Sequence, residues 1–197
     1  MSDSPEKPAI SNEEERRRIV NRLRRLSGQV RGVASMLGSE KECEAVLTQV
    51  MAIKSALGQV GMHVIGHAMK TCLIDESLRD KDDIVSAAFG VYLHYRDLGA
   101  AAGCSPSMEM GTPEPILDGL ARLEAQLKAV ELVIADNGGC EEALQQLSAA
   151  TATLNDVSLA ILGRAMHRCL ISPTEASREE VIDQAIEVFL RYSSCAR

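Results

Sequence analysis

The sequence predicts an all-α protein made of two tandem three-helix modules, which pack together as an antiparallel helical bundle and form a covalent pseudo-dimer. The 197-residue chain is 46% hydrophobic but only 3% aromatic and has no Trp. That composition favours helices packed through aliphatic side chains over a β sandwich. Apolar residues also recur at alternating spacings of three and four, as on the buried face of a helix. Finally, the chain aligns with itself without a gap at an offset of 97 residues, which indicates an internal repeat.

The repeat is clearest around the cysteines. Cys43-Glu44 aligns with Cys140-Glu141, and the run GHAMKTCLI at 66–74 aligns with GRAMHRCLI at 163–171. We therefore expect a first module at residues 12–98 (copy one), a linker at 99–112, and a second, degenerate module at 113–197 (copy two).

Each copy is predicted to contain three helices. The first helix of copy one has an apolar stripe formed by Ile19, Leu23, Leu26, Val30, Val33 and Leu37. Asn12 is its expected N-cap, before the acidic residues 13–15, and Gly38-Ser39 ends it. A second helix is expected from about residue 42 to about residue 73, and a third from about 81 to 95. In copy two, Pro113 and Pro115 open the first helix, residues 137–139 form the first turn, and Ser172-Pro173 follow the second helix.

The cysteine spacing predicts two dithiol sites. Cys43 and Cys72 stand at opposite ends of one predicted helix, about 43 Å apart, whereas a disulfide needs Cα atoms within about 7 Å. If the equivalent helix of copy two packs antiparallel to it, Cys43 lies beside Cys169 and Cys72 lies beside Cys140. Cys43 and Cys140 would begin their helices, where the helix dipole favours the reactive thiolate. The alternative is that these cysteines are small buried apolar residues. Two others, at 104 and 195, have no counterpart in the repeat and are expected to be accessory.

Charge is distributed unevenly between the copies. Residues 1–100 hold 14 of the 21 basic and 14 of the 28 acidic residues, so the whole net charge of −7 falls on the remainder. The first helix of copy one carries Arg16, Arg17, Arg18, Arg22, Arg24, Arg25 and Arg31, whereas copy two keeps only Arg122 and Lys128 at the aligned positions. Such a row either binds phosphates with salt-sensitive affinity or is simply a solvated helix face.

Two stretches of copy one, RRRIVNRLRRLSGQVRGVASML and CEAVLTQVMAIKSALGQVGMHVIGHAMKTCL, closely resemble the CsoR-like repressors. These are small all-helical bacterial DNA-binding proteins that sense copper, nickel or cobalt, formaldehyde, or reactive sulfur. The resemblance covers nearly all of residues 14–96 and is weaker in copy two. It implies operator DNA as a partner and a homodimer of tandem chains, a pseudo-tetramer, as the assembly. The implied DNA contacts are Arg17, Arg18, Arg22, Arg24, Arg25, Arg31 and Lys54, the last of which is replaced by Thr151 in copy two.

The resemblance also bears on the inducer. Copper sensors of this family place a His 25 residues after the first Cys, where this chain has Ala68 in copy one and Ala165 in copy two. His67 comes one residue early, which turns it about 100° around the helix. A Cys pair without that His resembles the persulfide-sensing branch, in which di-, tri- or tetrasulfide crosslinks release DNA and no cofactor is needed. The alternative is a Cu(I)- or Zn(II)-responsive repressor that uses Cys43, His63, His67 and Cys72.

Other functional classes are disfavoured by the sequence. No apolar run approaches the length of a membrane span, and the N-terminus is polar, so a cytoplasmic protein is expected. No nucleophile–base–orienter set or phosphate loop indicates an enzyme. A thiol-based sulfur carrier or a purely structural helical bundle remains open.

Overall fold

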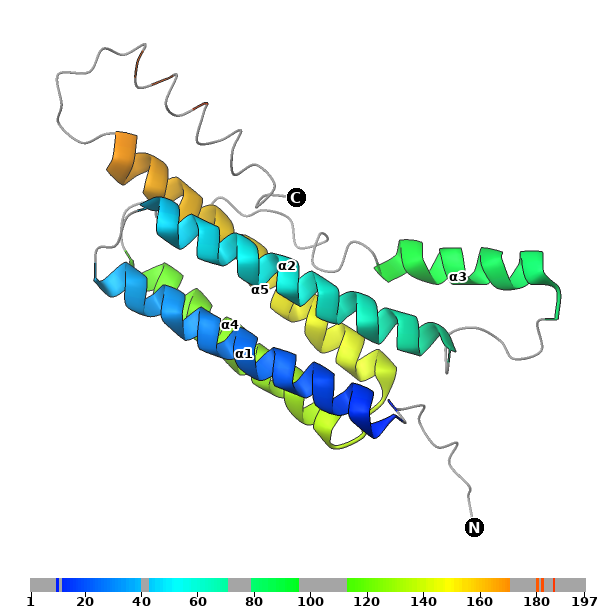
Figure 1. Ribbon diagram of the computed structural model, residues 1–197. Coiled ribbons are helices and arrows are strands. Elements are labelled where there is room, and N and C mark those ends of the chain that lie inside the picture. Colours follow the sequence, from blue (N-terminus) through cyan, green and yellow to red (C-terminus); the bar gives the residue numbers. More distant parts are fainter. Residues whose placement is uncertain are drawn as a thin grey trace.

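The computed structural model describes residues 10, 12–39, 43–70, 79–95, 113–170, 180, 182 and 186, with the backbone alone at 43, 44, 91–95 and 165–170. Within these residues there are five helices and no strand, which confirms the all-α prediction (Figure 1). The helices are α1 (Glu13–Gly38), α2 (Cys43–Ala68), α3 (Lys81–Tyr95), α4 (Glu114–Ala135) and α5 (Cys140–Leu170). A π turn at residues 69–70 extends α2. The third helix expected in copy two falls mostly outside the described residues.

Helices α1, α2, α4 and α5 form an antiparallel four-helix bundle. α1 packs against α4, α2 packs against α5, and the consecutive pairs α1–α2 and α4–α5 pack as helical hairpins. Figure 1 shows α1 and α4 side by side with opposite directions, and α2 and α5 in the same relation. α3 stands off from the bundle and contacts chiefly α2, leaving Ile84, Val85 and Phe89 exposed.

The buried core repeats with the same offset as the sequence. Leu23, Leu26 and Leu57 of copy one are almost inaccessible, and so are their equivalents 97 residues later. The buried pairs include Ile19/Ile116, Leu23/Leu120, Leu26/Leu123, Val30/Leu127, Val33/Val130, Leu47/Leu144, Val50/Leu147, Leu57/Leu154 and Val60/Val157. Both copies therefore contribute the same faces to one aliphatic core. None of the described helices is long and apolar enough to cross a membrane.

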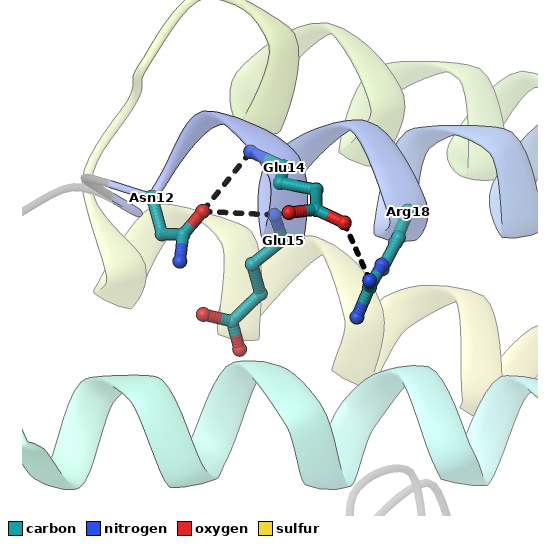
Figure 2. A network of polar contacts seen from close by, with 4 residues as sticks. All are labelled: Asn12, Glu14, Glu15 and Arg18. Carbon is teal, nitrogen blue, oxygen red and sulfur yellow. Dashed lines mark hydrogen bonds and ion pairs between the residues drawn. The ribbon is translucent and has the colours of Figure 1, made fainter.

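The two copies begin their first helices differently. In α1 the side-chain Oδ1 of Asn12 accepts hydrogen bonds from the backbone N–H groups of Glu14 (3.0 Å) and Glu15 (3.2 Å), as Figure 2 shows. This confirms Asn12 as the N-cap, which satisfies two N–H groups that have no partner inside the helix. α4 begins at Glu114, with Pro113 as an N-cap that makes no side-chain hydrogen bond. Pro115 follows in the first turn, where proline's fixed φ suits the helix and its missing N–H costs nothing.

The turn between α4 and α5 is tight and depends on a glycine. Asn137 adopts a left-handed conformation (φ 59°), and the Gly138 N–H donates to the Val133 carbonyl oxygen at 2.7 Å. A Cβ on Gly138 would lie 2.7 Å from that same oxygen, closer than such atoms approach. This turn sets where α5, and with it Cys140, begins.

Candidate nucleic-acid interface and thiol sites

The arginines of α1 occupy the part of the helix surface that the core leaves free. The apolar stripe of α1 is buried against α2 and α4, while five of the arginines are exposed and Arg16 and Arg22 are half-buried. The exposed ones are Arg17, Arg18, Arg24, Arg25 and Arg31. Their contacts divide the row into a side facing α4 and a side facing α2.

On the α4 side, arginines of copy one bond to copy two. Arg24 Nε donates to Glu131 Oε1 at 2.7 Å, and Arg31 Nη1 donates to Glu124 Oε1 at 2.8 Å. Arg16 Nη1 donates to Asn137 Oδ1 at 3.2 Å. The partners run backward along copy two as the position on α1 advances, as expected for two antiparallel helices.

On the α2 side, a groove of about 470 Å³ separates α1 from α2. Arg18, Arg22 and Arg25 of α1 line it together with His63 of α2, and Glu14 and Glu15 close its end near the start of α1. Figure 2 shows the Glu14–Arg18 pair one turn along α1 from the Asn12 cap. Arg22 and Arg25 make no ion pair within the described residues, so their positive charge is available to an anionic ligand.

The groove also contains residues that the sequence did not single out. A second hollow shares Arg22 and His63 with this groove and is lined on α2 by Ser55, Gln59 and Met62. The spacing of four that places Ser55, Gln59 and His63 on one face of α2 was readable from the sequence, but its alignment with Arg22 depends on how α1 and α2 pack. Lys54 is half-buried on α2 beside Ser55 and does not line the groove.

Copy two lacks an equivalent basic surface. Of the seven arginine positions it keeps Arg122 and Lys128, both exposed on α4. At the position of Lys54 it has Thr151, whose hydroxyl donates to the Leu147 carbonyl oxygen of its own helix at 2.8 Å. The asymmetry seen in the sequence is therefore an asymmetry between two surfaces of the folded molecule.

Three of the four predicted thiols belong to residues that the structure describes, and all three lie at or next to a helix end. Cys43 is the first residue of α2, Cys140 is the first residue of α5 and is buried, and Cys169 is the penultimate residue of α5. Since α2 and α5 pack antiparallel, the start of α2 and the end of α5 meet at the same end of the bundle (Figure 1). The side chains of Cys43 and Cys169, and all of Cys72, Cys104 and Cys195, lie outside the described residues, so the predicted pairing stays a prediction.

Comparison with known families finds the same family pattern in both copies. The sequence pattern described as "Metal-sensitive transcriptional repressor" matches residues 15–89 and matches again at residues 113–191. The chain belongs to this family. The double match supports the tandem fusion, and repressors of this kind are not an enzyme class.

Two curated members of this repressor family resemble part of the chain. The copper-sensing transcriptional repressor CsoR of Bacillus subtilis is 34% identical over 61 residues, which is 31% of this chain and 60% of CsoR. The copper-sensing transcriptional repressor RicR of Mycobacterium tuberculosis is 43% identical over 54 residues, which is 27% of this chain and 56% of RicR. The chain thus spans less than two thirds of either relative. No solved structure shows significant similarity to it.

Membership of a metal-sensitive family makes the histidines of α2 important. Ala68, at the position of the copper-sensor His, is completely buried. His67 is also buried, and its Nδ1 lies 4.0 Å from Glu15 Oε2 of α1. His63 lies in the arginine groove. The donor set therefore does not fit the copper-sensor arrangement, because the position that should supply an imidazole supplies a methyl group.

Proposed function

We propose that this chain is a DNA-binding transcriptional repressor that senses persulfides or polysulfides and releases operator DNA when facing cysteines become crosslinked. One observation carries the sulfur assignment: both copies keep the two cysteines, while the imidazole position is alanine in both and is buried at Ala68. The proposed sites are Cys43 with Cys169 and Cys72 with Cys140. The proposed organisation is a module at 12–98, a linker at 99–112 and a module at 113–197, with two chains forming a pseudo-tetramer.

The chemistry needs only the sulfur donor and two thiols. A cysteine thiolate attacks the sulfane sulfur of a persulfide, which forms a cysteine persulfide and expels the donor's thiol. The facing thiolate then attacks Sγ of the persulfidated cysteine, so that a Cys–Cys disulfide forms and the outer sulfur leaves as hydrosulfide. If both cysteines are persulfidated first, they combine to a trisulfide and release hydrogen sulfide. In each case the sulfane sulfur is the oxidant. Cys140 begins α5, where the helix dipole favours a thiolate, while its burial favours the neutral thiol.

Operator binding is assigned to copy one. The exposed arginines of α1 and the groove shared by Arg22, Arg25 and His63 offer phosphates a positive surface, to which the family resemblance adds Lys54. Copy two, with Thr151 and few basic residues on α4, completes the core and supplies one thiol to each proposed site.

The test follows crosslinking and DNA release together. The operator is first recovered by sequencing genomic fragments that the reduced protein retains. The reduced protein is then treated with a polysulfide donor while fluorescence anisotropy reports operator binding and peptide mass spectrometry maps crosslinks. We expect Cys43–Cys169 and Cys72–Cys140 products to accumulate as DNA is released. Release without either product would refute the sulfur mechanism.

Variants separate the two sites. Cys104→Ser with Cys195→Ser removes the cysteines that have no counterpart in the repeat and should leave both crosslinks intact. Cys43→Ser should abolish the Cys43–Cys169 product alone and preserve Cys72–Cys140. Comparing DNA release by these variants shows whether a crosslink at one site is sufficient to release the operator. Operator binding by each variant before the polysulfide donor is added confirms that the reduced proteins are folded.

A copper-responsive repressor is the second candidate, because both similar curated proteins are named as copper-sensing. It would use Cys43, His63, His67 and Cys72, with Cu(I) or Zn(II) as the inducer. Anaerobic titration with Cu(I) against a chromophoric chelator, again with anisotropy, tests it. Tight binding that releases DNA and is lost in His67→Ala would favour this candidate over the sulfur mechanism.

A further inference from the structure

The ion pairs between α1 and α4 join surface guanidiniums to carboxylates held between helices. The side chains of Arg24 and Arg31 are 62% and 66% exposed, whereas those of Glu131 and Glu124 are 18% and 34% exposed. Both guanidiniums are therefore accessible to a large anionic ligand from solvent. Each already has a carboxylate within hydrogen-bond distance on its inner side, which offsets its charge.

These pairs occur on one side of the bundle only. Under the 97-residue repeat, Glu124 and Glu131 correspond to Ser27 and Ala34 of α1, and Arg24 and Arg31 correspond to Ala121 and Lys128 of α4. The contacts that would mirror the observed pairs are thus Ala34 with Ala121 and Ser27 with Lys128, and neither is an ion pair. Copy two keeps two basic residues at the seven aligned positions and has carboxylates that pair with Arg24 and Arg31 of copy one.

We propose that Glu124 and Glu131 are intramolecular competitors of operator phosphates for Arg31 and Arg24. This inference rests on the proposed DNA-binding function of α1. A phosphate that approaches Arg24 meets a guanidinium whose charge Glu131 already compensates, so the contact releases less free energy than one to an unpaired arginine. The α2 side bears no such competitor at Arg22 and Arg25, whose guanidiniums make no ion pair in the described part of the chain. Arg22 and Arg25 on the groove side of α1 therefore contribute more to DNA affinity than Arg24 and Arg31. Glu124 and Glu131 keep the total DNA affinity lower than it would be without them.

The alternative to competition is that the carboxylates hold the arginines in the orientation that binds DNA. Glu131 bonds Arg24 through Nε and leaves both Nη atoms for a phosphate, so the pair is also compatible with a guanidinium fixed in place for DNA. Competition and orientation predict opposite signs. A Glu→Gln substitution removes the charge and keeps a hydrogen-bond acceptor. It raises DNA affinity if the carboxylate competes with phosphate, and it leaves DNA affinity unchanged or lowers it if the carboxylate orients the arginine.

The test uses the full chain with Glu124→Gln and Glu131→Gln combined. Fluorescence anisotropy with a labelled 30-bp duplex of mixed sequence, and with the recovered operator, is measured between 50 and 200 mM KCl. We expect tighter binding by about threefold to tenfold at the lowest salt, since two partly exposed ion pairs are removed. The slope of log affinity against log salt should steepen by up to about 2, because two more cations engage phosphates.

The matched control is Asp118→Asn with Glu142→Gln, which removes the same charge from exposed positions that make no ion pair within the described residues. A gain in DNA affinity no larger than that of this control reflects net charge rather than competition and overturns the proposal. In the Glu131→Gln background, Arg24→Ala should cost more DNA affinity than it does in the parent chain.

Failure of the inference and failure of the proposed function are distinguishable. If the parent chain binds neither duplex, or Arg22→Ala leaves binding unchanged, both fall. If the parent binds through Arg22 while the double variant binds no more tightly than the control, only the competition is refuted. Glu124→Gln alone, at the more exposed carboxylate, gives the same sign of change should the double variant be poorly folded.

Discussion

Replacing Gly138 by alanine tests the tight turn between α4 and α5. The added Cβ would lie 2.7 Å from the Val133 carbonyl oxygen and 2.8 Å from Val133 Cγ1. That oxygen also accepts the Gly138 N–H at 2.7 Å, so the backbone cannot retreat without lengthening the bond. We expect a loss of about 1–3 kcal/mol in the free energy of unfolding, which lowers Tm by roughly 3–10 °C in a chain of this size.

The matched control is Gly28→Ala in the middle of α1. An added Cβ there meets nothing within 4 Å, and the position is exposed. Alanine has the higher helix propensity, so this variant should gain about 0.5–1 kcal/mol and melt slightly above the parent. Far-UV circular dichroism during heating measures both. A Gly138→Ala protein at least as stable as the parent would show that the turn relaxes freely and that the steric reasoning is wrong. Since Cys140 follows two residues later, this variant should also change the rate at which that thiol reacts with a fluorogenic alkylating reagent.

Three further outcomes follow from equivalent or capping positions. Asn12→Ala should cost about 1 kcal/mol in unfolding free energy because α1 loses its cap, whereas Asn12→Ser should retain most of it; equal melting of the two would contradict the capping role. Leu57→Ala and Leu154→Ala change buried positions related by the repeat. Each should lower the free energy of unfolding, measured by denaturant titration, by about 2–5 kcal/mol. A large loss in only one of them would show that the copies do not share one core. Arg25→Ala should weaken DNA binding and reduce the slope of log affinity against log salt concentration by about 1. Arg122→Ala, at the aligned position in copy two, should leave that slope unchanged. Equal losses of affinity would show that both copies contact DNA.

Most of the fold was accessible from sequence because local signals agree with one another. The structure confirms two predicted helix starts within a residue or two: α1 after Asn12 and α4 near Pro113 and Pro115. It also confirms the apolar stripe as the buried face of α1. The repeat supplied the rest, since the same buried positions recur in both copies. The loose placement of α3 was not predicted, because nothing in the sequence says how closely a short helix packs on its neighbours.

The surface was only partly predictable. The arginines of α1 are evident in the sequence, but their division into two groups depends on the α1–α4 register. That register decides that Arg24 meets Glu131, which lies 107 residues away. The sequence also presented His63 only as an alternative metal ligand, whereas the packing of α1 on α2 places it beside Arg22. Long-range register arises from core packing as a whole, so no local pattern encodes it.

Covalent fusion changes what a single substitution can do. In a homodimer of identical modules, each mutation appears twice, once on either side of the twofold axis. A glutamate introduced to meet an arginine across that axis would then arise in both subunits and neutralise both basic surfaces together. Here Glu124 and Glu131 are encoded once and act on Arg31 and Arg24 of one surface alone. A gene that carries both modules can therefore change one surface of the bundle without changing the other, which an assembly of identical single modules cannot do.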